Sequence, residues 1–170
     1  VVVGETTCDG KKKRDEYMSR FKDVFIMELP NTQRPEALQL WKGEIIRFKE
    51  YLEEKFDVTI TEEDIREAIR VNNAGSRSLK QLYEVMLNDP VPITGHDLFK
   101  GLYGSTFKFD RKAIPEEVDA LVEKIKKEYA EGKMLEKKPR ILITGCPVGG
   151  ATEKVIDAVE NNGGVVVTFE

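Results

Sequence analysis

The chain has 170 residues, with 27 Lys and Arg against 31 Asp and Glu, and a formal net charge of −4 at pH 7. This near balance argues against a protein that binds nucleic acid through a basic surface. Two cysteines exclude a disulfide-stapled scaffold, and a single histidine argues against a zinc site built from several histidines. The longest apolar runs, such as residues 165–167, are too short to span a bilayer, which needs about 20 residues.

Both ends of the chain carry runs of β-branched residues, at 1–3 and 165–168. Such runs are typical of parallel strands buried between neighbours on both sides. We therefore expect the chain to be a piece of a larger protein that supplies the missing neighbours. The alternative is a chain trimmed of a short leader.

Patterns in the first part of the chain predict a strand at residues 1–4, a helix from about residue 11, a strand at 24–30 and a long helix that begins at Pro35. The first helix should place Tyr17, Met18 and Phe21 on one face. The long helix has apolar residues spaced by three and four, which are Leu38, Trp41, Ile45, Phe48 and Leu52.

The middle of the chain reads as helical. Thr61 and Asp64 form a capping-box pattern, with Asp in place of the usual Glu or Gln, and open a helix. The polar stretch at 72–76 can break this helix before its apolar stripe continues through residues 79–86. A shorter helix is predicted from Thr94 and a long one from Ile114.

The last part predicts a strand at 140–144, a tight loop at 145–150, a helix at 151–161 and a final strand from 165, which together form a βαβ unit. The fold class is therefore α/β, with parts of two doubly wound parallel-sheet domains joined by a helical segment. We expect the end of a first α/β domain at 1–30, a helical middle segment at 31–138 and the start of a second α/β domain at 139–170.

The two cysteines occupy equivalent places, because Cys8 and Cys146 each follow a predicted strand and precede a predicted helix. Open α/β sheets carry their sites at the carboxyl ends of strands, and a helix N-terminus favours a thiolate. Thiolates bind soft metals and iron–sulfur clusters, and Gly145, Gly149 and Gly150 would let a bulky ligand approach the backbone. The residues alone leave open whether the cysteines are ligands or small buried hydrophobes. Two thiolates cannot complete a four-iron cluster, so the remaining ligands would come from outside this chain.

Several other polar residues are candidates for a site. Lys11 is the best placed of a basic run at 11–14 to offset the charge of a bound cluster, although such runs are usually solvated helix faces. Glu5 is a candidate proton donor and His96 a candidate acid or base, and His96 could equally cap or pack a helix. Three residues could contact substrate or hydrogen-bond a helix break: Asn72, Asn73 and Arg77.

The strings at 4–13 (GETTCDGKKK) and 140–155 (RILITGCPVGGATEKV) resemble the 2-hydroxyacyl-CoA dehydratase and benzoyl-CoA reductase family, closest to its branch of double-cubane cluster proteins. The middle region, with Trp41, Lys42 and Asn72-Asn73 followed by Arg77, also fits the family. The resemblance covers essentially all 170 residues, and its most specific part is the string TTCDGKKK.

The resemblance implies an oxygen-sensitive iron–sulfur enzyme that receives a low-potential electron from a separate ATP-hydrolysing iron–sulfur activator. Dehydratase members use the electron to make a ketyl radical on a 2-hydroxyacyl-CoA, whereas double-cubane members reduce small molecules. By this analogy Cys8 would ligate one 4Fe-4S cubane, and Cys146 a second cubane in the double-cubane branch only. The resemblance also implies a homo- or heterodimer, a small-molecule or acyl-CoA substrate, and a cytoplasmic, anaerobic setting.

Three functions therefore remain open. The favoured one is the iron–sulfur component of an electron-injection reductase, and the second is a 2-hydroxyacyl-CoA dehydratase subunit, a lyase. The third is a non-catalytic scaffold subunit. Because ligands are missing from this stretch, we expect the isolated chain to hold no intact cluster and to be inactive.

Overall fold

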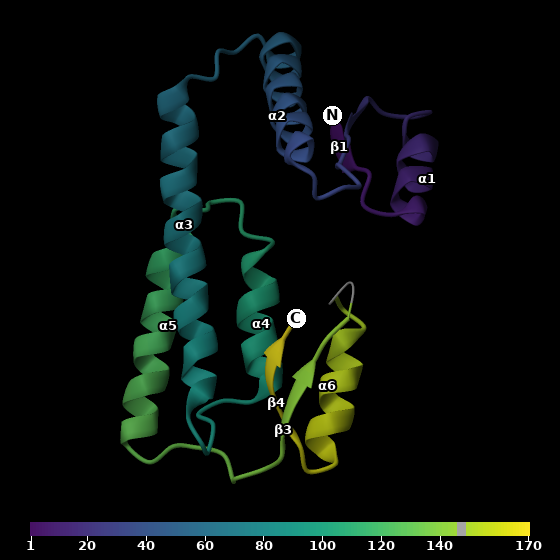
Figure 1. Cartoon of the computed structure of the whole chain (residues 1–170). Helices are drawn as coiled ribbons and strands as arrows, with labels where there is room; N and C mark the ends of the chain where they lie inside the picture. Colours follow the sequence, from purple (N-terminus) through teal and green to yellow (C-terminus); the bar gives the residue numbers. More distant parts are fainter. Residues whose placement is uncertain (146–148) are drawn as a thin grey trace. The chain divides into compact units, whose positions relative to one another are not determined.

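The computed structural model describes residues 1–145 and 149–170, and its helices and two parallel strand pairs are those of an α/β fold. They fall into two compact units, Val1–Ile65 and Arg66–Glu170, which are described separately (Figure 1). In chain order the elements are β1 (Val2–Glu5), α1 (Asp9–Met18), β2 (Val24–Met27), α2 (Pro35–Phe56), α3 (Glu62–Glu84), the short 3-10 helix η1 (Val85–Leu87), α4 (Gly95–Ser105), α5 (Ala113–Ala130), β3 (Arg140–Ile143), α6 (Thr152–Asn161) and β4 (Val165–Phe169).

In the first unit, β1 and β2 form a parallel pair in register from Val2 opposite Val24 to Glu5 opposite Met27. Neighbouring residues of a strand point to opposite sides of the sheet. The two helices contact strand residues that point to opposite sides, so α1 and α2 lie on opposite faces of this pair. Gly4 faces Asp15 of α1, whereas the Phe25 ring packs against Phe48 of α2, with ring centroids 5.1 Å apart. This is the local arrangement of a doubly wound sheet.

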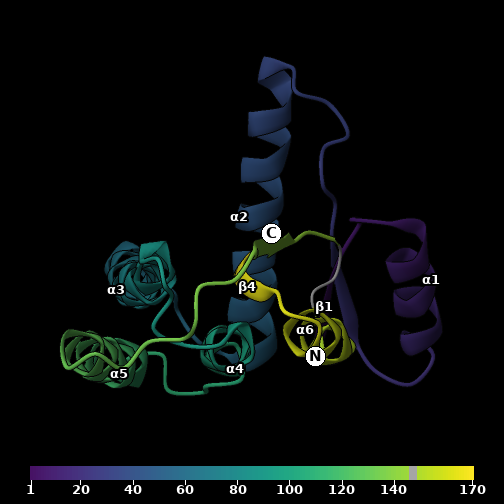
Figure 2. The same ribbon diagram turned by 90° about the horizontal axis from the view of Figure 1, so that it is seen from below.

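In the second unit, β3, α6 and β4 form the predicted βαβ unit with parallel strands. Helices α4 and α6 pack on β4, and α3 and α5 lie side by side in both views (Figures 1 and 2). Val165 and Val166 point to opposite faces and enter different clusters. The larger cluster joins α3, η1, α4, α5 and β4 through Leu82, Val85, Met86, Val91, Leu98, Ile114, Val118, Val122, Ile125 and Val165.

The capping box of α3 is confirmed. The backbone N–H of Asp64 donates to Thr61 Oγ1 at 3.2 Å, and the Thr61 N–H donates to Asp64 Oδ2 at 2.9 Å. The helix then runs unbroken from Glu62 to Glu84, so the predicted break at 72–76 is wrong. Gly75 is buried and faces Ile114 of α5. Packing of α3 against α5 at this point offsets the low helix propensity of glycine.

Other corrections concern burial. Phe21 lies beyond the end of α1 and is exposed, and Leu38, on the predicted apolar face of α2, is 69% exposed. In the described chain β1 pairs with β2 alone and Val3 is exposed, so burial of this strand between two neighbours stays a prediction for the larger protein. The units group α2 with the first two strands and most of α3, with α4 and α5, with the last two strands. The division at 1–30, 31–138 and 139–170 stays a prediction.

Among the helices described, none is both long and apolar enough to cross a membrane.

Candidate functional site

The first cysteine lies where the sequence predicts it, between the end of β1 at Glu5 and the start of α1 at Asp9. Cys8 is the N-cap of α1, with an extended backbone (φ −152°, ψ 162°). Its Sγ accepts a hydrogen bond from the backbone N–H of Lys11 at 3.4 Å, as a serine or threonine oxygen would in this position. The thiol is exposed and faces the positive end of the helix dipole, which favours negative charge on sulfur.

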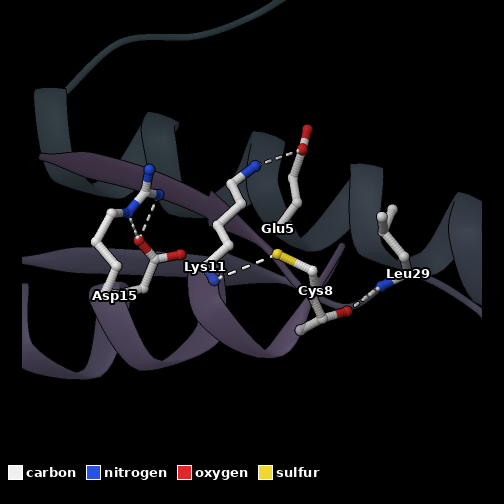
Figure 3. A network of polar contacts seen from close by, with 7 residues as sticks. Glu5, Cys8, Lys11, Asp15 and Leu29 are labelled. Atoms are coloured by element: carbon white, nitrogen blue, oxygen red, sulfur yellow. Dashed lines mark hydrogen bonds and ion pairs between the residues drawn. The ribbon is translucent and has the colours of Figure 1, made fainter. Parts of the chain in front are cut away.

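An ion pair and a threonine hold the loop that carries Cys8 (Figure 3). Lys11 Nζ lies 3.0 Å from Glu5 Oε2, so this ion pair spans the cysteine. Thr6 joins the loop to the segment after β2, because its N–H donates to the Met27 carbonyl at 3.2 Å and its Oγ1 accepts from the Leu29 N–H at 2.8 Å. The cysteine loop, residues 5–11, is therefore held at the carboxyl ends of both strands.

The basic run at 11–14 is paired with nearby acids rather than free. Lys12 lies 3.4 Å from Asp9, Lys13 lies 2.7 Å from Glu16, and Arg14 donates to Asp15 through Nε at 2.7 Å. Of the four basic residues, Lys11 alone pairs with an acid on the far side of Cys8. This pairing distinguishes Lys11, the candidate chosen from the sequence, from the three basic residues that follow it.

Asp15 is a residue that sequence reasoning missed. Its side chain is only 2% exposed, and in the described part of the chain its Oδ2 has no hydrogen-bond partner. The carboxyl group lies over Gly4, where a Cβ would come within 2.2 Å of Oδ2. No local pattern marks an aspartate in a charged helix as buried, because its burial depends on the strand packed beneath it.

The described residues can supply one thiolate to a metal but not a complete metal site. No group of three or more His, Cys, Asp and Glu side chains within residues 1–145 and 149–170 is arranged to hold an ion. A four-iron cluster usually takes four protein thiolates, so Cys8 fits as one ligand of a larger set. The soft sulfur and the N–H donated to it suit such a bond.

The second glycine-rich loop follows β3, and Cys146 within it lies outside the described residues. Gly145 has φ of +152°, at the edge of the region that favours glycine. The Thr152 N–H donates to the Gly149 carbonyl at 2.8 Å and closes the turn into α6. Within the described chain, space beside Gly145 and Gly150 is open to 4 Å, and only the Tyr103 hydroxyl comes this near Gly149. The role of these glycines in admitting a ligand stays a prediction.

Tyr103 was not singled out by the sequence, although Phe99, Tyr103 and Phe107 follow one another at a spacing of four. The Tyr103 ring stacks on Phe99, with centroids 5.1 Å apart, and its hydroxyl lies 3.8 Å from the position of a Cβ on Gly149. The helical spacing is the signal that could have placed Phe99 and Tyr103 on one face of α4.

The remaining candidates lie in the second unit. His96 is in the first turn of α4, and its Nε2 lies 3.6 Å from Glu153 Oε1 of α6, an ion pair when the imidazole is protonated. Asn72, Asn73 and Arg77 lie on the exposed surface of α3. Because α3 is continuous, they do not serve a helix break. Their contact with substrate stays a prediction, as do the acid–base roles of His96 and Glu5.

The family follows from comparison with known proteins. The model of the family described as 2-hydroxyglutaryl-CoA dehydratase, D-component, matches residues 1–170. The chain belongs to this family. YjiM of Escherichia coli (strain K12), which carries the provisional name of a dehydratase subunit, is 47% identical over 171 aligned residues, a match that covers 100% of this chain and 45% of YjiM. The chain thus spans just under half the length of this dehydratase relative, and the resemblance predicted from the cysteine motifs is confirmed.

Proposed function

We propose that this dehydratase-family chain is part of an iron–sulfur protein that accepts electrons from an ATP-hydrolysing activator and passes them to a small-molecule or acyl-CoA substrate. The observation that carries the proposal is the exposed thiol of Cys8 at the N-terminus of α1, in a loop held by Thr6 and Glu5. A bound cluster would supply one-electron chemistry, and Cys8 would hold it through a thiolate. Membership in the family supports an enzyme system rather than an isolated binding module.

The double-cubane reductase is our first choice because Cys146 lies in a second strand–loop–helix connection of the same kind. We propose Cys146 as a ligand of a second cubane, with Gly145, Gly149 and Gly150 giving that cluster access to the backbone. The ion pair that holds Lys11 beside Cys8 supports its role in offsetting the negative charge of a cluster. The partners are the activator and a second subunit, in a cytoplasmic, anaerobic setting.

The alternative is a 2-hydroxyacyl-CoA dehydratase subunit, which the family description and the dehydratase name of YjiM favour. In that case Cys8 alone of the two cysteines would bind iron. Binding of CoA thioesters to the intact protein would support the dehydratase, whereas a lack of such binding would favour the reductase.

The deciding experiment measures iron and sulfide content and the electronic spectrum of the intact protein that carries this chain, reconstituted without oxygen. The variants are Cys8→Ala and Cys146→Ala, with Thr7→Ala as a matched control, because Thr7 is an exposed neighbour of Cys8. Loss of iron in both cysteine variants is expected for a double-cubane reductase. Loss in Cys8→Ala alone would indicate the dehydratase. A wild-type protein without iron would overturn the enzyme proposal in favour of a scaffold subunit.

A further inference from the structure

The backbone around Cys8 has a feature that a ligand-bearing loop needs, which is attachment on both sides of the ligand. On the carboxyl side, α1 begins directly after Cys8, and the Lys12 N–H donates to the Cys8 carbonyl at 3.0 Å. On the amino side, only residues 6 and 7 separate Cys8 from the end of β1. The amino side is therefore the part of the loop that side chains must hold.

Thr6 holds this amino side at two points. Its N–H continues the strand pairing by donating to Met27, and its Oγ1 then accepts the Leu29 N–H, beyond the end of β2. The Thr7 N–H turns back to the Glu5 carbonyl at 2.8 Å, so the chain bends sharply just before Cys8. In the described chain the Thr7 side chain makes no hydrogen bond, which singles out Thr6 from a neighbour of the same type.

Glu5 connects the two sides of the loop. Its carboxylate lies 3.0 Å from the ammonium of Lys11, whose backbone N–H also donates to Cys8 Sγ (Figure 3). The Lys11 side chain is partly buried, unlike the exposed side chain of Lys13 in its pair with Glu16. The pair thus closes a small ring that contains the cysteine.

We propose that Thr6 and Glu5 are positioning residues for Cys8, with Thr6 anchoring its loop to Leu29 just after β2 and Glu5 acting through Lys11. The inference rests on the proposed role of Cys8 as a cluster ligand. It assigns Glu5 a function through its ion pair rather than through proton donation. Side chains that orient a metal ligand commonly change metal affinity about 10- to 100-fold when they are removed.

The anchor itself is tested on the intact protein that carries this chain, prepared without metal, by hydrogen exchange of the Leu29 amide. Thr6→Val removes the acceptor but keeps the β-branched shape, whereas Thr6→Ser keeps the hydroxyl. We expect Leu29 to exchange about fivefold faster or more in Thr6→Val, because its acceptor is lost, and at nearly the wild-type rate in Thr6→Ser and in the control Thr7→Val. Unchanged exchange in Thr6→Val would overturn the anchor.

The positioning role is tested by the rate at which a chelator removes iron from the intact, reconstituted protein. Thr6→Val should lose iron about tenfold faster than wild type, with Thr6→Ser and Thr7→Val close to wild type. Glu5→Gln should also lose iron faster, whereas Glu16→Gln, which removes a similar pair away from Cys8, should not. Because Glu5 acts through Lys11, Glu5→Gln should add nothing in a Lys11→Met background.

The outcomes separate the two proposals. If wild type binds iron and both Thr6→Val and Glu5→Gln release it at the wild-type rate, the positioning role is wrong while the proposed function stands. If wild type binds no iron, the proposed function fails and the inference with it, whatever the Leu29 exchange shows about the anchor. Glu5→Gln keeps the test decisive if Thr6→Val does not fold.

Discussion

At the scale of single residues, Gly4 of β1 and Asp15 of α1 approach each other too closely for a side chain at position 4. The carboxyl group is buried, with one oxygen bound by Arg14 and the other without a partner in the described chain. Leaving a buried polar atom unpaired costs about 1–3 kcal/mol, so this contact is a local weakness that the packing of α1 must offset. Only a residue without a Cβ leaves space for it.

Gly4→Ala tests this close approach. Its Cβ would lie 2.2 Å from Asp15 Oδ2 and 2.9 Å from Ile26 Cδ1, so we expect the free energy of unfolding to fall by about 1–3 kcal/mol. Denaturant unfolding, followed through the exchange of β1 and β2 amides, measures the loss. Gly10→Ala is the matched control, because in the described chain no atom beyond its own turn of helix lies within 4 Å of its Cβ position. Equal stability of the two variants would contradict the contact.

At the scale of elements, α2 is attached to β2 by a mixture of rings and charges. Phe25 packs against Tyr51, with centroids 4.6 Å apart, and the Tyr51 hydroxyl donates to Asp23 at 3.0 Å. Lys55 pairs with the same carboxylate at 2.5 Å. The hydrogen bond from Lys55, and then that from Tyr51, lowers the pKa of Asp23 below its usual 3.8, and Asp23 raises the pKa of Lys55 in return.

This attachment predicts a dependence of stability on pH. A carboxyl group whose pKa is lower in the folded state stabilises fully above its unfolded pKa and loses that contribution as pH falls through the folded value. We therefore expect the first unit to lose stability as pH falls below 3.8, and Asp23→Asn to flatten this part of the curve. Tyr51→Phe, which removes the weaker of the two bonds, should give an intermediate curve. Urea unfolding at a series of pH values measures all three, and a slope unchanged in Asp23→Asn would contradict the attachment.

At the scale of the whole molecule, the chain divides into two units with separate contacts, Val1–Ile65 and Arg66–Glu170. The main cluster of buried apolar residues belongs to the second unit and includes Leu82, which is 1% exposed and packs where Gly101 leaves room on α4. The cysteine loop belongs to the first unit, whose helix α2 has no buried residue. A substitution that removes packing in this cluster should therefore destabilise the second unit before the first.

Leu82→Ala tests this division. A buried Leu→Ala change costs about 2–5 kcal/mol, so the amides of α3 to α5 should exchange faster while those of β1 and β2 keep their rates. Ile69→Ala is the matched control on the same helix, because Ile69 is 53% exposed and should change stability by about 0.5 kcal/mol or less. Equal acceleration in both units would show that they unfold as one.

The sequence by itself determined the order of strands and helices, the α/β class, the family, the capping box of Thr61 and Asp64, and the position of Cys8 at a helix start. These depend on neighbours a few residues away, or on a motif short enough to be read directly. Only the tertiary structure decided that α3 continues through Asn72 and Asn73, that Leu38 stays exposed, and that Asp15 is buried over Gly4. The tertiary structure also brings together Thr6 and Leu29, which are 23 positions apart in the sequence. The physical reason is that burial and long-range hydrogen bonds depend on which elements pack together.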